Sequence, residues 1–451
     1  MLGIKNINRK CIVVAIVVIF GIVQSFSQTV EHNASAQVKL FNSNTEELPY
    51  WFTHNQRGRI SDSTNVLAST GYKFNYNTNS NQSISIGANV QYIYRAASNF
   101  QIDQLYINYT NRWLSATLGT KHPDIKYNEL SSSNGNILWS GNTRAIPGLL
   151  LKASTPINVT KGIALNWGIG HYELVEDRYA KGAKIHYKSL GAFIKFNKKS
   201  KLHLGIKHYV QWAGDTEAFG KAPSGISDFV DIFFAKKAGD ENAIDGEKVN
   251  ALGNHLGLYD INYSYKFKNA ILKVYHQHLF EDGSGSAFKN FPDGIWGIYL
   301  SNKNTWLSAL LYEYTYTLNQ SGSSGRSGID NYFSNGFYRS GWRYKNRVIG
   351  IPFITPNTIE NGPGNNRIKA HHLGVKLEFK KLNVLIKGTV LERLGTYRAR
   401  LDPKEKSLYS YINGSYQLSN KFLMSMTVGL DYNSFNNNVY GIGVGLKYSM
   451  F

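Results

Sequence analysis

The sequence predicts an all-β fold, a transmembrane antiparallel β-barrel of about 18 strands, with long extracellular loops and a short helix in one loop. Three observations support this prediction. Apolar and polar residues alternate with a period of two along most of the chain, and the alternating segments are 10 to 14 residues long. The connections between these segments alternate between short and long, as in outer-membrane barrels.

The first residues predict a separate leader. Lys5, Arg9 and Lys10 precede the apolar run 11–20, and small residues follow it before Gln28. The apolar run is short for a bilayer crossing, so residues 1–27 are predicted to be a secretory signal peptide. We expect residues 28–48 to form an N-terminal extension or plug segment, and residues 49–451 to form the barrel.

The charge of the exported chain limits its partners. Without residues 1–27, the chain keeps 47 basic and 30 acidic residues, a net charge of +17 over 424 residues. Such an excess of basic residues often indicates nucleic-acid binding. Because this chain is predicted to be exported, we expect no nucleic-acid partner. The expected counter-charges are an acidic surface polymer and the anionic groups of outer-membrane lipid and lipopolysaccharide.

The alternation is clearest over residues 422–432, where one face is wholly apolar, and it recurs at 84–95, 259–267 and 373–380. A soluble sandwich would also alternate, but ordinary strands are mostly five or six residues long. Segments of 10 to 14 residues match a tilted bilayer crossing with lipid outside and water inside. We therefore expect the outer membrane of a Gram-negative bacterium as the location.

The connections divide into two classes, which predict two different rims. The short ones lie near 78–81, 111–112, 156–160, 197–199, 268–269, 302–304, 380–381 and 419–420. The long or irregular ones lie near 61–65, 96–100, 121–146, 176–181, 213–255, 282–292, 319–368, 394–406 and 433–437. Short turns are expected on the periplasmic rim and long loops on the extracellular rim.

The strand count follows from these connections. Seventeen segments run from residue 66 to the end, and closure with a periplasmic C-terminus needs one more upward strand. Residues 49–60 (PYWFTHNQRGRI) are predicted to supply it. The alternative count is 16, if a short segment such as 101–110 or 293–301 does not cross the membrane.

Two local patterns concern the loops and the C-terminus. Residues 227–234 have a helix-start pattern, and we expect a short helix packed over or into the lumen mouth. The last segment alternates from Tyr440 to Tyr448, and the chain ends in Phe451. This ending resembles the assembly signal of outer-membrane barrels and implies the barrel-assembly machinery as a partner. We expect a monomer.

The sequence offers little support for catalysis, and we predict no enzyme, no cofactor and no metal site. His276 and His278 share a strand face and His371 and His372 are adjacent, but neither pair has an obvious third ligand. The run 321–328 is a flexible loop, and no G-x-S-x-G nucleophile elbow occurs. A surface hydrolase remains as a third hypothesis.

Several motifs over residues 250–380 resemble one family. They are Gly253-Asn254-His255-Leu256-Gly257, Asp293-Gly294-Ile295-Trp296-Gly297, Leu311 to Thr317 (LYEYTYT) followed by Asn319 to Gly322, Asp330-Asn331-Tyr332, Gly341-Trp342, Ile349 to Phe353 (IGIPF), Asn365-Asn366-Arg367 and His371 to Gly374. In this order they are similar to the capsule-assembly (Wzi-type) outer-membrane proteins of Bacteroidetes-like bacteria. The N-terminal part departs most from the family.

The resemblance implies an 18-stranded barrel with a surface lectin-like role, which helps to attach or assemble capsular or other exported polysaccharide, such as exopolysaccharide, at the cell surface. The same barrel could instead be a porin or solute channel. The long connections 213–255 and 319–368 could fold over the lumen and block it, which favours the first reading.

A polysaccharide site is predicted on the outer face, chiefly in loop 319–368 with help from 282–296 and 121–146. Sugars present apolar C–H faces and hydroxyls, so a site needs aromatic platforms beside polar groups, and acidic sugars favour Arg. The predicted polysaccharide-binding residues are Trp139, Arg144, Asp293, Trp296, Asp330, Tyr338, Arg339, Trp342 and Arg343, with Tyr332 and Arg347 in the same loop. The alternative is that the aromatic residues fold the loops together or form the outer girdle, and that the arginines meet lipopolysaccharide phosphates.

Overall fold

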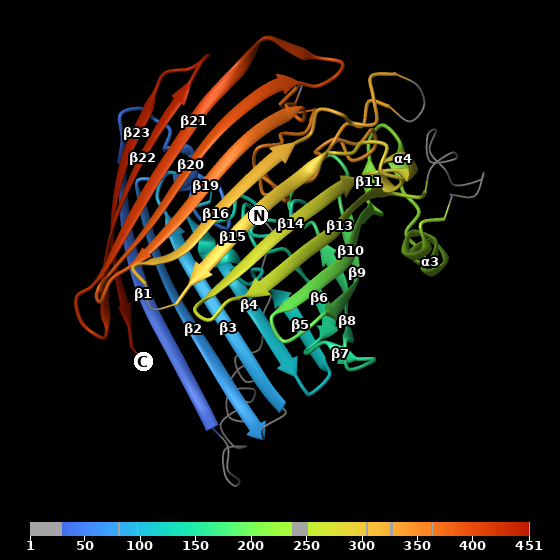
Figure 1. The fold of residues 1–451 in the computed structure, drawn as a ribbon. Coiled ribbons are helices and arrows are strands. Elements are labelled where there is room, and N and C mark those ends of the chain that lie inside the picture. Colours follow the sequence, from blue (N-terminus) through green and yellow to red (C-terminus); the bar gives the residue numbers. More distant parts are fainter. Residues whose placement is uncertain are drawn as a thin grey trace, which may run out of the picture.

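The computed structural model describes residues 29–79, 82–96, 98–236, 251–303, 305–324, 328–359, 361–362 and 364–450. Within these residues eighteen long strands form one closed antiparallel barrel (Figure 1). The wall strands are β1 (Thr29–Ser43), β2 (Val66–Asn79), β3 (Gln82–Ile93), β4 (Phe100–Thr110), β5 (Leu114–Thr120), β6 (Pro147–Ala153), β8 (Ile163–Glu173), β9 (Lys184–Lys195), β10 (Ser200–Trp212), β13 (Asn254–Lys266), β14 (Ala270–Phe280), β15 (Gly294–Asn302), β16 (Leu307–Tyr316), β19 (Ile368–Glu378), β20 (Leu382–Gly395), β21 (Arg400–Gln417), β22 (Phe422–Asn433) and β23 (Val439–Ser449). The predicted fold class is confirmed. The predicted signal peptide and Phe451 lie outside the described residues.

Smaller elements decorate the wall and the loops. The two-residue strand β7 (Ile157–Asn158) pairs antiparallel with β8, where Ile157 lies opposite Leu165. The loops carry two short hairpins, β11 (Asp215–Thr216) with β12 (Gly220–Lys221) and β17 (Arg343–Tyr344) with β18 (Arg347–Val348). The helices are α2 (Tyr50–Thr53), α3 (Ile226–Phe234), α4 (Gly283–Ser286) and the 3-10 turn η1 (Tyr127–Glu129). Among the described residues, no helix has the length and apolar character needed to cross a membrane.

The two faces of the wall have different solvents. Along β22 the outward side chains are apolar and remain exposed, from Phe422 at 40% to Tyr432 at 51%, whereas the inward Thr427 and Asp431 are buried. An apolar outer face without protein cover fits a surface that meets lipid. The predicted alternation therefore has the predicted orientation.

The connections confirm the two rims. All eight short connections predicted from the sequence join neighbouring wall strands at one end of the barrel, and the long loops lie at the other end. Seventeen wall strands run from residue 66 to the end, as predicted.

The eighteenth strand is not the one that was predicted. β1 closes the barrel by pairing with β2 on one side and with β23 on the other, where Lys39 lies opposite Gly445. Residues 29–43 of the predicted extension 28–48 are therefore wall rather than an extension or plug, and the prediction of a strand over 49–60 was wrong. That segment forms α2 and turns into the lumen, where Trp51 and Phe52 are buried. Its apolar residues reflect burial against protein and not contact with lipid.

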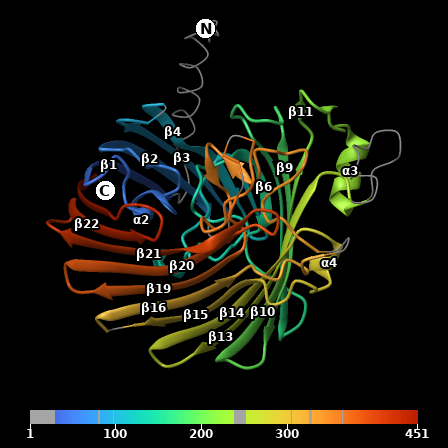
Figure 2. The ribbon, with the colours of Figure 1, turned by 90° about the horizontal axis from the view of Figure 1, so that it is seen from above.

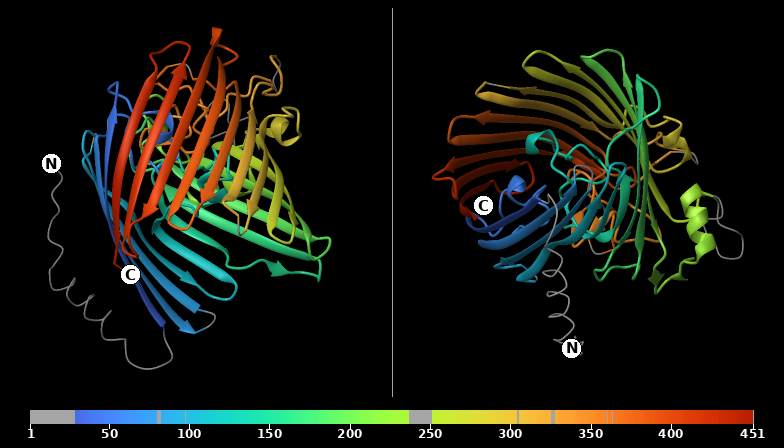
Figure 3. Two further views of the ribbon diagram at one scale, coloured as in Figure 1. Left: turned by 60° about the vertical axis from the view of Figure 1, so that its left-hand side comes forward. Right: turned by 90° about the horizontal axis from the view of Figure 1, so that it is seen from below.

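Three extracellular loops fill the lumen: 44–65, 121–146 and 317–367 (Figures 2 and 3). Loop 121–146 crosses from one wall to the other. His122 Nε2 lies 2.9 Å from Asp103 Oδ1 on β4, and the Ile137 N–H donates to Gln277 Oε1 on β14 (3.0 Å). The Ile351 N–H of the large loop donates to the Ile137 carbonyl (2.8 Å), so the loops also bind each other. Their buried apolar residues form one core with the inward side chains of the wall.

Helix α3 lies outside the barrel and not over the lumen mouth, so that prediction was wrong (Figures 1 and 2). Phe229 packs edge-on against His186 of β9, with ring centroids 5.1 Å apart, and against Trp212 at the end of β10 (5.6 Å). Both wall residues lie on the outward face. This part of the wall carries histidines where lipid would otherwise lie, and α3 covers them with apolar side chains. Its own outer side exposes Ile226 (87%) and Phe234 (64%).

Candidate functional site

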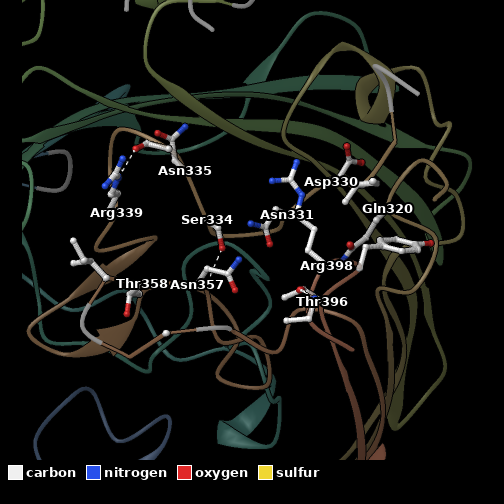
Figure 4. Close-up of a pocket in the computed structure, with 16 residues that line it drawn as sticks. Gln320, Asp330, Asn331, Ser334, Asn335, Arg339, Asn357, Thr358, Thr396 and Arg398 are labelled. Atoms are coloured by element: carbon white, nitrogen blue, oxygen red, sulfur yellow. Dashed lines mark hydrogen bonds between the residues drawn. The ribbon is translucent and has the colours of Figure 1, made fainter. Parts of the chain in front are cut away.

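An open pocket of about 700 Å³ lies between two loops at the extracellular rim (Figure 4). One wall comes from loop 317–367, which joins β16 to β19, and the other from the tight loop 396–399 between β20 and β21. The lining residues are Gln320, Ile329, Asp330, Asn331, Ser334, Asn335, Gly336, Arg339, Asn357, Thr358, Ile359, Gly362, Thr396, Tyr397, Arg398 and Ala399. The volume falls in the range of small-ligand sites, which is roughly 300–1,000 Å³.

Amides and hydroxyls on the floor of the pocket are held by short local hydrogen bonds. The Asn357 N–H donates to Ser334 Oγ (2.9 Å), and Asn335 Oδ1 accepts from the backbone N–H of Phe337 (2.9 Å). The side-chain amide of Asn366 donates to Asn331 Oδ1. Asn357 Oδ1 accepts from the Gly364 N–H, so the side-chain amides of Asn331, Asn335 and Asn357 are each held in one direction and present polar groups in a set pattern.

Arginine and aromatic side chains form the sides. The Arg339 guanidinium lies 5.2 Å from the ring centroids of both Tyr179 and Phe219, and its Nε donates to the Gly336 carbonyl (3.1 Å). Tyr397 carries the Arg367 guanidinium 4.1 Å from its ring centroid and donates its hydroxyl to the Leu318 carbonyl (3.0 Å). Arg398 is exposed. In Figure 4, Arg339 lies at one end of the pocket, and Asp330 and Gln320 lie at the other.

Two carboxyl groups, one lining the pocket and one beside it, have a pKa above the ordinary value. Burial raises the pKa of Asp330 to about 6, against a hydrogen bond from Ser321 Oγ (2.7 Å) that favours the charged form. Burial also raises the pKa of Asp293 to about 6. Asp293 accepts hydrogen bonds from the Tyr332 hydroxyl (2.7 Å) and the Gln320 N–H (2.8 Å), so it ties three loop segments together under the pocket.

Of the nine predicted site residues, the structure brings Asp330 and Arg339 together in this pocket. Tyr338 and Trp342 are buried in the core of the loops, at 1% and 0% exposure. The Tyr338 hydroxyl donates to the Ala213 carbonyl (3.1 Å), and Trp342 Nε1 donates to the Leu138 carbonyl (2.6 Å). These rings hold the loops together and present no accessible face to a sugar.

The remaining predicted residues are dispersed. Trp296 lies on the outward face of β15, stacked on His276 with ring centroids 3.8 Å apart, as expected for a residue of the outer girdle. Arg144 donates to the Ile102 carbonyl (2.8 Å), and Arg343 donates to the Asn346 carbonyl within its own hairpin (2.9 Å). Trp139 lines a different cavity, deeper in the lumen. Asp293, already placed under the pocket, and Tyr332 are buried, and Arg347 bonds Asp62 Oδ1 (2.8 Å).

Sequence reasoning missed the side of the pocket formed by Tyr397 and Arg398, and the amides of Asn331 and Asn357. The run Tyr397-Arg398-Ala399-Arg400 places an aromatic residue beside arginines in a loop, which is the same pattern that predicts the other site residues. This run forms part of a pocket only because loop 317–367 lies next to it. The barrel topology brings the two loops together, and the local sequence does not show this. Among the described residues, no group of three or more His, Cys, Asp or Glu side chains could hold a metal ion.

The comparisons with known proteins agree with this architecture. The family model described as "Capsule assembly protein Wzi" matches residues 23–354. Among curated proteins, none is significantly similar in sequence.

The chain is also similar to several solved structures. Wzi of Escherichia coli, described as an outer-membrane carbohydrate-binding β-barrel involved in group 1 capsule assembly, has 14% identity and a TM-score of 0.59, with 92% of this chain and 83% of that chain covered. OccK7 of Pseudomonas aeruginosa (10% identity, TM-score 0.46, 94% and 99% covered) and OccAB4 of Acinetobacter baumannii (12%, 0.47, 94% and 98%) are also similar. The family match extends over most of the chain, and the barrel has the strand order and the exposed apolar belt that such a protein requires. The chain therefore belongs to the capsule assembly protein Wzi family and is a β-barrel of a Gram-negative outer membrane.

Proposed function

We propose that this protein binds capsular or other exported polysaccharide in the pocket between loops 317–367 and 396–399, holds it at the cell surface in a lectin-like manner, and catalyses no reaction. The observation that carries the proposal is the pocket itself. It opens at the extracellular rim of a barrel whose lumen is crossed by loops, and it combines an aromatic ring, ordered amides and two arginines.

The chemistry of the pocket suits a sugar chain. Tyr397, Ile329 and Ile359 offer apolar surface for the C–H faces of sugar rings, and the amides of Asn331 and Asn357 can exchange hydrogen bonds with hydroxyls. The guanidinium groups of Arg339 and Arg398 can bind a carboxylate, which suits an acidic polymer. The capsule-related role of the family supports this choice of ligand.

The first test compares pocket variants for binding of the native polysaccharide, purified from the cell surface, to folded protein in detergent. Arg398→Gln and Tyr397→Leu should each weaken binding about fivefold or more, because a charge-assisted hydrogen bond or a stacked ring contributes about 1 kcal/mol or more. Arg400→Gln is the matched control, since it removes the same charge from a neighbouring exposed position outside the pocket.

The outcomes separate the alternatives. Parent-like binding by both pocket variants would contradict the proposed site. If the loss caused by Arg398→Gln disappears at high salt, the polymer is acidic, whereas an effect of Tyr397→Leu alone indicates a neutral polymer.

In cells, deletion of the gene should release surface polysaccharide into the medium while its synthesis continues. We also propose that the protein works as a monomer, embedded in outer-membrane lipid and lipopolysaccharide by the barrel-assembly machinery.

A further inference from the structure

Two adjoining cavities lie inside the barrel, beneath the loops. The larger has a volume of about 420 Å³ and is lined by residues of β5, β6, β8, β9 and β10 together with residues of loop 121–146. The smaller, of about 270 Å³, is lined by β2, β3 and β4 and by the same loop. Both include Lys121, His122, Pro123 and Asp124, so they meet at this segment. We call the pair the inner cavity.

The inner cavity extends toward the periplasmic rim. The loop core lies on its extracellular side, and the lining reaches Ala153, the last residue of β6 before the short periplasmic connection. Asp124, Ile125 and Lys126 are exposed although the wall strands surround them, which places them against water inside the barrel. A ligand can therefore approach from the side of the short turns.

The charge of the inner cavity is strongly positive. Its lining contains six cations, Arg57, Lys73, Lys121, Lys126, Lys152 and Lys207, and only one of the lining residues, Asp124, is a carboxylate. Lys207 Nζ binds Asp260 at 3.2 Å, whereas Lys152 Nζ lies 4.0 Å from Asp124, with the Lys152 side chain 45% exposed and the Asp124 side chain 76% exposed. The Lys207 ammonium lowers the pKa of Lys126 to about 8, despite the opposing attraction of Asp260 and Asp124. Positive charges thus line the same cavity.

Aromatic rings form the roof of the larger cavity. Trp139 stacks on Tyr209 with ring centroids 5.6 Å apart, and Tyr209 stacks on Tyr187 at 4.9 Å. Tyr172 completes the group, 4.9 Å from Trp139. All four rings line the cavity, and Trp139 and Tyr187 are only partly buried. Apolar ring surface beside several ammonium groups is the combination that recognises a sugar carrying a carboxylate.

We propose that the inner cavity is a second binding site, which takes a carboxylate-bearing oligosaccharide from the periplasmic side. The inference rests on the proposed function for the choice of a sugar. The residues of the inner cavity are separate from those of the pocket between loops 317–367 and 396–399, which we call the outer pocket. The loops between the two sites keep them apart, so the same acidic polymer would be recognised on both sides of the outer membrane.

The test measures the affinity of a short oligogalacturonate for the folded full chain by calorimetry, at several salt concentrations. The double variant Lys126→Gln and Lys152→Gln should weaken binding about tenfold and reduce its dependence on salt. Lys198→Gln with Lys199→Gln is the matched control, because it removes two exposed charges from a periplasmic turn outside the cavity. A neutral malto-oligosaccharide of the same length should bind the parent more weakly and should not distinguish the variants.

Each result decides a separate question. Equal affinity of the parent and the Lys126/Lys152 variant would overturn the inner site, as would a loss seen only with Arg398→Gln. Inorganic phosphate that binds the parent as tightly as the oligogalacturonate would overturn the assignment to a sugar. If the native polysaccharide fails to bind the parent while oligogalacturonate binding still depends on Lys126 and Lys152, the proposed outer function fails and the inner site stands.

Discussion

Asp330 is expected to make the pocket between loops 317–367 and 396–399 sensitive to pH. Its pKa of about 6 means that the carboxyl is mostly charged at pH 7.5 and mostly neutral at pH 5, and Asp282 and Asp293 lie close enough to add repulsion. The binding of an acidic polymer should therefore strengthen as the pH falls through 6, because one negative charge leaves the pocket. Asp330→Asn should bind as the parent does at low pH and should lose most of this pH dependence.

The measurement is the affinity for native polysaccharide between pH 5 and 7.5, with a neutral polymer as the control. An unchanged pH profile in Asp330→Asn would contradict the assignment.

The raised pKa of Asp330 also determines how the stability of the folded state depends on pH. The folded state binds this proton more tightly than the unfolded chain, whose carboxyl titrates near 3.8, so stability is lost as the pH rises from about 4 to 6.

Single residues also show what the sequence could not reveal. Trp342 and Tyr338 have the residue types of a sugar platform, but a buried core requires the same types, and the sequence does not distinguish the two roles. The distinction depends on Leu138 and Ala213, whose carbonyls accept their hydrogen bonds from loops far away in the chain. Asp330 and Arg339 were found because charged side chains in an extracellular loop are seldom fully buried.

At the scale of elements, Glu313 of β16 holds loop 121–146 in the lumen. It is fully buried and accepts hydrogen bonds from Ser131 Oγ (2.7 Å), the Ser132 N–H (2.7 Å), Ser132 Oγ (2.6 Å) and the Tyr275 hydroxyl (2.6 Å). Glu313→Ala would leave these donors without a partner, at a cost of about 1–3 kcal/mol or more. We expect a lower midpoint of thermal unfolding and brief openings in single-channel recordings.

Ser415→Ala is a suitable control for Glu313→Ala, because Ser415 lies on the inward face of the wall and bonds Asn413 within the same strand. A Glu313→Ala protein with the stability and current traces of the parent would show that the loop is held by its apolar contacts alone.

The elements were predictable where one face is strongly apolar, as in β22, and were missed where that contrast is weak. The outward face of β1 includes His32, Ala34 and Ala36, so its alternation is faint, whereas Tyr50, Trp51 and Phe52 looked like a crossing. Helix α3 was predicted correctly as a helix, but its position outside the barrel depends on the histidines of β8 and β9, which no local pattern connects to it.

At the scale of the whole molecule, the filled lumen predicts the electrical behaviour. Purified parent protein in a planar bilayer should show no steady large conductance, because three loops cross the lumen and bind one another and the wall. Replacement of residues 121–146 by a short flexible linker should produce a stable open pore in a barrel that still folds. A steady large conductance of the parent would instead favour the porin alternative.

The seam between β1 and β23 has a consequence for the order of events during folding. Every other wall contact joins strands separated by one connection, but the seam pairs Ser35 with Ser449 and Ser43 with Gly441, near the two ends of the described chain. Bringing such distant segments together costs about 3 kcal/mol more than closing a ten-residue hairpin. The seam is therefore expected to form last, and until then both terminal strands expose unpaired backbone groups. During that interval a newly made chain is most prone to pair with another chain, so the time spent before closure, rather than the stability of the finished wall, would limit its yield.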